Sequence, residues 1–240
     1  MSPSTLLEAM ALTKGAPVSL GAQADGFAGN QVQLLGLMAA MAIVPFAVMM
    51  LTSFSKIAVV LSIVRSAIGT QQAPPTMVLT GLAAVLSTTI MTPTFEKMWG
   101  SGRVAYEETG AAVELVQRAP MVLQPLRDFL VRHGSPEERA RFVDMARELR
   151  PPDEAQLVSE DDLAIVVPAF VITELKEAFV IGFLVFLPFL VLDMLIANVL
   201  LALGMQTLSP SQVSLPFKIL LFVAVDGWSL LARGLILGYR

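Results

Sequence analysis

Apolar residues gather in long runs along the chain, and few charged residues interrupt them. Leu34–Thr52 contains no charged residue. After the turn-forming segment Gly69–Pro75, a second apolar run covers Thr76–Thr92. Each run is close to the roughly 20 residues that an α-helix needs to cross a bilayer. We therefore expect two hydrophobic helical regions in this part, the first kinked at Pro45 and the second ended by Pro93.

The C-terminal half repeats this pattern. Leu163–Met205 is the longest apolar region, with enough residues for about two membrane spans. Thr207–Pro216 has the composition of a loop, and Ile219–Leu231 is apolar again. The expected breaks in the long region are at Pro168, Gly182, Pro188 and Gly204. The chain thus has four hydrophobic helical regions, two on each side of a polar segment, and we expect them to pair as helical hairpins.

The polar segment between them runs from Thr94 to Asp162 and predicts amphipathic helices. Ser135 and Glu138 flank Pro136 in the spacing of a capping box, which marks a helix start. Two sets of apolar residues follow helical spacing: Val122, Leu126, Phe129 and Leu130, then Phe142, Met145, Ala146 and Leu149. We interpret the segment as a small water-facing helical insertion.

Composition supports a membrane-type protein with one solvated part. Charged residues make up 15% of the chain and the mean hydropathy is +0.70, whereas soluble domains are nearer a quarter charged. Between Glu96 and Asp162 there are 14 acidic and 9 basic side chains. This balance does not favour nucleic acid as a partner. The chain has no cysteine, and its single histidine, His133, is expected to be exposed and solvated.

These observations predict an all-α fold in four parts. The first ten residues lack a basic region of the kind that begins a signal peptide, so we expect a flexible extension there. The parts are the extension (1–33), the N-terminal hydrophobic helices (34–93), the soluble insertion on the periplasmic side (94–162), and the C-terminal hydrophobic hairpins (163–240) with a loop near 204–216.

A conventional membrane topology does not fit this division. Lys56 and Arg65 place the turn between the first two regions in the cytoplasm by the positive-inside rule, and the acidic insertion outside. Arg233 and Arg240 would then also lie outside, against the rule. The mismatch suggests that some of these helices do not simply cross a bilayer.

Charged residues inside the apolar segments are the main candidates for a functional role, because a charge in such a setting is costly unless it is paired. They are Glu174, Glu177, Asp193, Lys218 and Asp226. Lys218 and Asp226 would lie about 12 Å apart on one helix, at 1.5 Å per residue, so each needs a partner on another helix or in another subunit. One alternative is that these segments lie outside lipid and the charges are solvated. We expect instead an oligomer in which these five residues form ion pairs between subunits.

The sequence contains no recognisable catalytic or cofactor-binding motif: no nucleotide-binding glycine loop, no HExxH and no cluster of metal ligands. We expect no enzyme activity, cofactor or metal. A proton-coupled transporter could use Asp193 and Asp226, but the chain shows no inverted repeat in support of that class. Met205 differs from the other methionines because it ends an apolar helix beside Gly204, where a flexible thioether suits a deformable seal.

Three segments closely resemble the FliP/SctR family of bacterial type III secretion export proteins. They are MTSFSKIAVVLSIVRSAIGTQQAPP (50–75), VPAFVITELKEAFVIGFLVFLPFLVLDMLIANVLLALGM (167–205) and SLPFKILLFVAVDGW (214–228). The resemblance extends over about residues 34–239, with the acidic insertion in the expected place. Gln71-Gln72 and the absence of a signal peptide make the chain more similar to the injectisome branch than to flagellar members, which commonly carry a cleaved signal sequence.

The resemblance implies an assembly and a location. Family members form a homo-pentamer that joins SctS/FliQ-type and SctT/FliR-type subunits in a helical, pseudo-hexameric export gate. The gate belongs to the bacterial inner membrane, in contact with membrane lipid, although much of it lies at periplasmic level. Secreted proteins pass unfolded through its pore. A location largely at periplasmic level would explain why a conventional membrane topology conflicts with the positive-inside rule.

The resemblance also implies a pore gasket. The family's methionine-rich loop corresponds to Gly204, Met205, Gln206 and Thr207, and Phe217 is placed to support it. Other members have several methionines in succession here, whereas this chain has only Met205. A ring of Met205 side chains from several subunits is the constriction that we expect.

Overall fold

A computed structural model describes residues 35–36, 38–39, 41–70, 73–109, 119–205 and 207–240. These residues form α-helices and no strand, which confirms the all-α fold class. The described residues divide into two compact units, with the boundary between Ala47 and Val48. The predicted extension at 1–33 lies outside the described residues.

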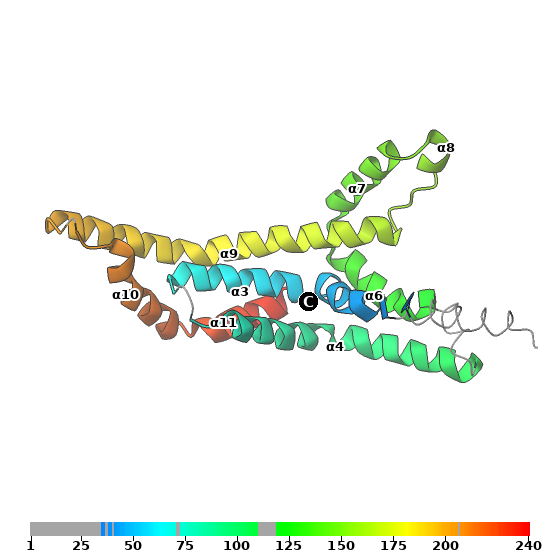
Figure 1. Cartoon of the computed structure of the whole chain (residues 1–240), viewed down its shortest axis with the longest axis horizontal. Helices are drawn as coiled ribbons and strands as arrows, with labels where there is room; N and C mark the ends of the chain where they lie inside the picture. The colour runs from blue at the N-terminus through cyan, green and yellow to red at the C-terminus, as the bar shows by residue number, and fades with distance from the viewer. Residues whose placement is uncertain (1–34, 37, 40, 71–72, 110–118, 206) are drawn as a thin grey trace, which may run out of the picture. The chain divides into compact units, whose positions relative to one another are not determined.

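The second unit contains the helices that carry the candidate residues (Figure 1). They are α3 (Phe54–Ile68), α4 (Thr76–Thr109), α6 (Ala119–His133), α7 (Pro136–Glu148), α8 (Pro152–Ala155), α9 (Leu163–Ala202), α10 (Pro210–Ala224) and α11 (Gly227–Leu237). In addition, a helix covers Met41–Met50 and continues through Pro45; the helical structure is interrupted at 51–53. Two helices, Thr76–Val104 and Leu163–Ala202, are long and apolar enough to cross a membrane, or up to four if each of two bent pairs counts as one span.

Helix α3 forms the centre of the unit. Ile57, Val60, Leu61 and Val64 follow the i, i+3, i+4, i+7 spacing and are all but fully buried. They join a core to which α4, α9, α10 and α11 contribute. Burying each such side chain stabilises the fold by about 1.5–3 kcal/mol. Much of the apolar surface of α3 is therefore covered by the chain's own helices.

Helix α9 is one continuous helix of 40 residues, so the breaks expected at Pro168, Gly182 and Pro188 do not occur. At 1.5 Å per residue it is about 60 Å long, roughly twice the thickness of a bilayer core. Pro168 and Pro188 lie within it, and each removes only one backbone hydrogen bond. Packing of α9 along α3, α6, α7 and α10 offsets that loss. A hairpin does form, but between α9 and α10 (Figure 1).

Helix α4 also continues through a predicted break. It runs from Thr76 to Thr109 with Pro93 in its interior, so the boundary predicted at 93/94 falls within a helix. The residues after Pro93 pack against α6, where Gly102 approaches the side chain of Val122. This packing holds the helix together across the missing hydrogen bond. The predicted insertion therefore begins as an extension of α4.

The predicted amphipathic helices are present as α6 and α7. In α6, Phe129 and Leu130 are buried as expected. In α7 the predicted face is partly wrong: Val143 is buried, whereas Met145 is 45% and Leu149 86% exposed. Helix α7 contacts the start of α9 and Val158 through Phe142, Val143 and Ala146. This contact covers a narrower face of α7 than the sequence spacing predicted.

The predicted capping box is absent at the start of α7. Ser135 is the N-cap residue with Pro136 following it, but its side chain makes no capping hydrogen bond. Its backbone N–H donates to Thr173 Oγ1 on α9 at 2.9 Å. The Glu138 carboxylate contacts Lys176 of α9 and Arg141 instead of the backbone. Contacts with α9 thus replace the two hydrogen bonds of the predicted capping box. The Lys176 ammonium beside Glu138 lowers the pKa of that carboxyl.

Candidate functional site

The turn between α9 and α10 has a defined backbone structure. Gly204 has a φ of 73°, in the left-handed region that favours glycine. The Met205 N–H donates to the Leu200 carbonyl at 2.9 Å, and the Gly204 N–H donates to the Leu201 carbonyl at 3.0 Å. This pair of bonds is the Schellman motif that ends many helices. Met205 therefore follows directly from a fixed helix end.

The turn exposes the candidate gasket residues. Met205 is 47% exposed, and Thr207 is also exposed. Gln206, the fourth residue of the proposed gasket, lies outside the described residues. Phe217 is 49% exposed on α10, about two turns beyond the helix start. The structure brings Gly204, Met205 and Thr207 together at one turn; a sealing role for them stays a prediction.

Lys218 lies in a buried polar cluster that joins three helices. Its Nζ is 2.6 Å from Asp193 Oδ2 on α9 and donates to the Ala67 carbonyl, near the end of α3, at 3.3 Å. The Ser214 hydroxyl donates to the other oxygen of Asp193. A cation near a helix C-terminus is favourable because of the helix dipole. Lys218 and Ser214 are buried, so the cluster holds α10 against both neighbours.

Lys56 makes a second cluster, between α3 and α9. Its Nζ is 3.0 Å from Glu174 Oε1 and 2.6 Å from Glu177 Oε2. It also lies 4.2 Å from the centre of the Tyr239 ring, a cation–π distance. The Tyr239 hydroxyl donates to Glu174, whose side chain is fully buried. The last residues of the described chain are thus fixed to α9.

The cation shared by Glu174 and Glu177 was missed by the sequence reasoning. Lys56 was considered only for membrane topology, although it lies in an apolar run just as Lys218 does. The same rule about charges in apolar helices would have identified it. Tyr239 gave no such signal, because an aromatic residue near the end of an apolar helix is unremarkable.

Four of the five residues predicted to pair between subunits therefore have partners in their own chain. These are Glu174, Glu177, Asp193 and Lys218. Each of these charges has a partner of opposite charge within its own chain. The cost of placing them in apolar helices therefore does not by itself require a second subunit. An additional role between subunits stays a prediction, since a single chain does not test it.

Asp226, the fifth residue, lies at a break between helices. It has a φ of 51° and separates α10 from α11, which are bent by 58°. A Cβ on Gly227 would be 2.3 Å from the Phe222 ring, so this glycine permits the sharp turn. Lys218 and Asp226 are consequently on different helices. Within the part of the chain that the structure describes, Asp226 forms no ion pair.

His133 is partly buried, and not exposed and solvated as the sequence predicted. Its ring lies 4.7 Å from the Phe129 ring and 5.0 Å from the Tyr239 ring. Burial lowers the pKa of His133, and the nearby Arg132 and Lys56 cations lower it further. The sequence around His133 did not reveal this partial burial, because Tyr239, whose ring packs against His133, lies far away in the sequence.

These clusters are suited to holding helices together. Among the described residues, no three His, Asp or Glu side chains gather as metal ligands would. In each cluster a lysine contacts one or two carboxylates on another helix. Among the described residues, the arrangement holds helices together and leaves the turn after α9 and an extensive apolar surface exposed.

Comparison with known proteins agrees with this. The sequence profile of the FliP family matches residues 37–235. The chain is 43% identical over 210 residues to the hypersensitivity response secretion protein HrcR of Ralstonia nicotianae, covering 86% of this chain and 96% of the relative. It is 40% identical over 215 residues to the Yop proteins translocation protein R of Yersinia pestis, covering 88% and 97%.

A flagellar relative is similar to the same degree. The chain is 40% identical over 223 residues to the flagellar biosynthetic protein FliP of Caulobacter vibrioides, covering 93% of this chain and 81% of the relative. The resemblance inferred from three segments is confirmed, and so is the prediction that the protein is not an enzyme. On the profile match and on these long alignments, the chain belongs to the FliP family, a family of secretion-apparatus proteins.

Proposed function

We propose that this protein is a pore-forming subunit of a type III secretion export gate. Five copies would assemble with SctS/FliQ-type and SctT/FliR-type subunits and conduct unfolded proteins across the bacterial inner membrane. The assembled gate would lie largely at periplasmic level. Relatives named for secretion and translocation support the injectisome branch, and the flagellar relative keeps a flagellar gate as the alternative. A transporter acting alone has no support in these comparisons.

One observation carries the proposal: the apolar surface of α9 and α10 is largely uncovered in the single chain. Phe183 is 60%, Leu195 59% and Leu220 66% exposed. Apolar surface exposed to this extent requires lipid or other protein chains to cover it. Helix α9 is too long for one bilayer span, so part of it needs protein neighbours. Assembly into a multi-subunit gate supplies them.

The turn after α9 supports a pore role. Met205 is exposed on a backbone fixed by the Schellman motif, so several copies would present the thioether at one level. A flexible thioether closes a gap of changing shape better than a branched side chain. Phe217 would pack behind this ring.

The ion-pair clusters leave room for contacts between subunits. The Glu177 side chain is 53% and the Asp193 side chain 30% exposed, and Asp226 is exposed. A neighbouring cation could approach each of them. We keep all five residues as candidates for such pairing, in addition to their contacts within the chain.

Native mass measurement of the detergent-purified complex tests the proposal. We expect a particle that contains five copies of this chain together with the two other subunit types. A monomer or dimer that retains full function would overturn the proposal. Co-expression with and without the S/Q-type and T/R-type subunits distinguishes a homo-pentamer from the complete gate.

A further inference from the structure

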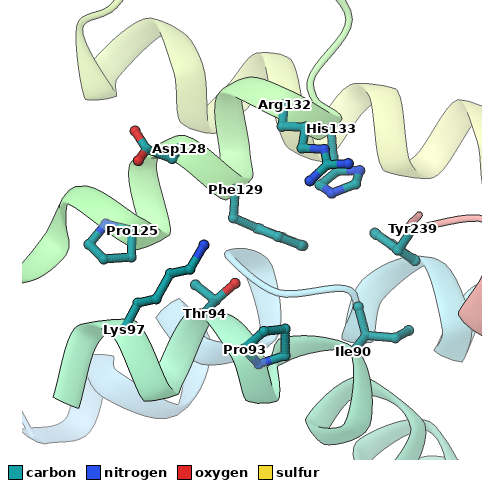
Figure 2. Close-up of a pocket in the computed structure, with 10 residues that line it drawn as sticks. All are labelled: Ile90, Pro93, Thr94, Lys97, Pro125, Asp128, Phe129, Arg132, His133 and Tyr239. Carbon is teal, nitrogen blue, oxygen red and sulfur yellow. The ribbon is translucent and has the colours of Figure 1, made fainter. Parts of the chain in front are cut away.

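A cavity of about 240 Å³ lies between α4 and α6, away from the turn after α9 and bordered at Tyr239 by the Lys56 cluster. Figure 2 shows Thr94 and Lys97 extending from α4 toward α6, and Arg132 and His133 at the end of α6. Its walls are partly apolar and partly polar. The cavity is large enough for a small polar group with part of an attached chain.

The cations at this cavity have no acidic partner among the described residues. Lys97 and Arg132 both line it, and neither makes an ion pair in that part of the chain. The one acidic side chain in the lining, Asp128, accepts a hydrogen bond from the Gln124 amide at 2.9 Å. Two cations beside a single carboxylate leave a net positive charge at the cavity, which favours an anionic ligand.

Part of the lining of the cavity is apolar. Pro93 of α4 and Pro125 of α6 both line the cavity, together with Ile90 and Phe129. A proline has no backbone N–H, so neither can donate a hydrogen bond into the space. The cavity thus combines cations with apolar side chains. This combination suits an amphiphile, whose charged head group would contact the cations while its first methylene groups contact the apolar side chains.

The position along α4 indicates what kind of amphiphile this is. Thr76–Phe95 has no charged residue, and Lys97 is the first cation after it. Trp99, 78% exposed, follows within a turn. Tryptophan and lysine at the end of a charge-free stretch are typical of the interface between hydrocarbon and water. In a membrane, the cavity would lie at the level of lipid head groups.

We propose that this cavity binds the head group of an anionic phospholipid. The phosphate oxygens would accept hydrogen bonds from Lys97 and Arg132, and Thr94 would donate a third from its hydroxyl. The glycerol and the first methylene groups would lie on Pro93, Ile90 and Phe129. The bound lipid would fix α6 to α4 and stabilise the packing around Tyr239. This inference requires the end of α4 near Lys97 to lie in the part of the protein that contacts membrane lipid, but it does not require the export function proposed above.

Native mass spectrometry of the purified complex tests the site with dioctanoyl phosphatidylglycerol as the probe. The double variant K97Q/R132Q should bind it at least about tenfold more weakly than the wild type, since each lost charged hydrogen bond is worth about that factor. Arg103→Gln is the matched control, because Arg103 lies on the same helix in an exposed pair with Glu107, outside the cavity. Its affinity should equal that of the wild type.

Two further arms identify the ligand class. Dioctanoyl phosphatidylcholine, whose phosphate is neutralised by its own cation, should bind much more weakly. Inorganic phosphate should compete only at far higher concentration, because it lacks the apolar part. Unchanged phosphatidylglycerol binding by K97Q/R132Q, or equal binding of inorganic phosphate, would overturn the proposal. If the double variant fails to assemble, the single variants K97Q and R132Q give the same comparison, each with a partial loss expected.

Discussion

Gly182 of α9 lies against Ile63 of α3 so closely that a Cβ at this glycine would be 2.5 Å from Ile63 Cδ1 and 2.9 Å from Ile63 Cγ2. The sequence pattern suggested that Gly182 breaks the helix. Instead, the glycine lets the two most extensively paired helices of the chain approach each other within an unbroken helix. The contact lies between the two ion-pair clusters on α9.

The first prediction concerns this contact. Gly182→Ala should destabilise the protein by about 1–3 kcal/mol, because an added methyl group in a close-packed contact forces the helices apart. Thermal unfolding in detergent measures it. Gly81→Ala is the control, since nothing lies within 4 Å of that position and alanine favours the helix. Ile63→Ala in the Gly182→Ala background should restore part of the loss; no restoration would argue against this contact as the cause.

The second prediction concerns the buried pair of Lys218 and Asp193. Lys218→Ala should destabilise the protein by about 1–3 kcal/mol, because it leaves the partly buried Asp193 carboxylate without its cation. Recovery of assembled complex should fall more than expression does. Pull-down of the complex and thermal unfolding measure the two effects.

The double variant K218M/D193N separates the pair from simple loss of a side chain. It removes both charges, so it should be less destabilised than Lys218→Ala. Arg103→Ala, which removes one partner of an exposed pair, should change stability by less than about 1 kcal/mol. Normal assembly and stability of Lys218→Ala would refute the role of this cluster.

The third prediction concerns pH. Burial and nearby cations lower the pKa of His133 below its ordinary value of 6.5, so the unfolded chain binds the proton more readily than the folded chain. The associated stability is fully present above pH 6.5 and is lost as the pH falls from that value through the lowered pKa of His133 in the folded chain. The melting temperature should therefore drop between pH 7.5 and pH 5.5. His133→Phe retains an aromatic ring without a titrating group and should show a smaller drop.

This experiment is unusually direct because the chain has only one histidine. The carboxyl groups are the same in the wild type and in His133→Phe, so their contribution cancels in the comparison. If His133→Phe and the wild type lose equal stability between the two pH values, His133 is not the group responsible.

The fourth prediction concerns the turn. Met205→Ala should leave assembly intact but increase the leakage of small solutes through the gate, since the exposed thioether no longer narrows the pore. Solute release from vesicles containing the complex measures the leakage. Leu208→Ala is a matched control, because Leu208 is similarly exposed, at 48%, just beyond the turn. An unchanged leak in Met205→Ala would argue against the gasket.

A cross-linking experiment adds a geometric test of the same turn. The chain has no cysteine, so Met205→Cys introduces a single reactive thiol. Disulfide-linked dimers should form under mild oxidation if neighbouring subunits bring this residue together around a pore, since a disulfide needs Cα atoms within about 7 Å. Met77→Cys, at a site 87% exposed on α4, provides the comparison for random contact.

Much of the fold could be predicted from the sequence because hydrophobic periodicity is local. The apolar runs, the amphipathic spacing of α6 and the loop before α10 all depend on neighbours a few residues apart. Prolines misled the prediction in α4 and α9. The proline itself determines the cost of the one missing backbone hydrogen bond. The packing that offsets this cost comes from helices that are distant in the sequence.

The sequence alone determined that this protein is helical, apolar, free of cysteine and a member of its family, because those properties reside in residue order and composition. The tertiary structure decided which charges meet. Lys218 lies 151 positions from the Ala67 carbonyl that it contacts, and Lys56 meets Glu174 and Glu177 across the α3–α9 interface. A charged residue within an apolar segment can be recognised from the sequence, and its burial is unfavourable unless it has a partner of opposite charge. The identity of the partner depends on how whole helices pack, and that is fixed only in three dimensions.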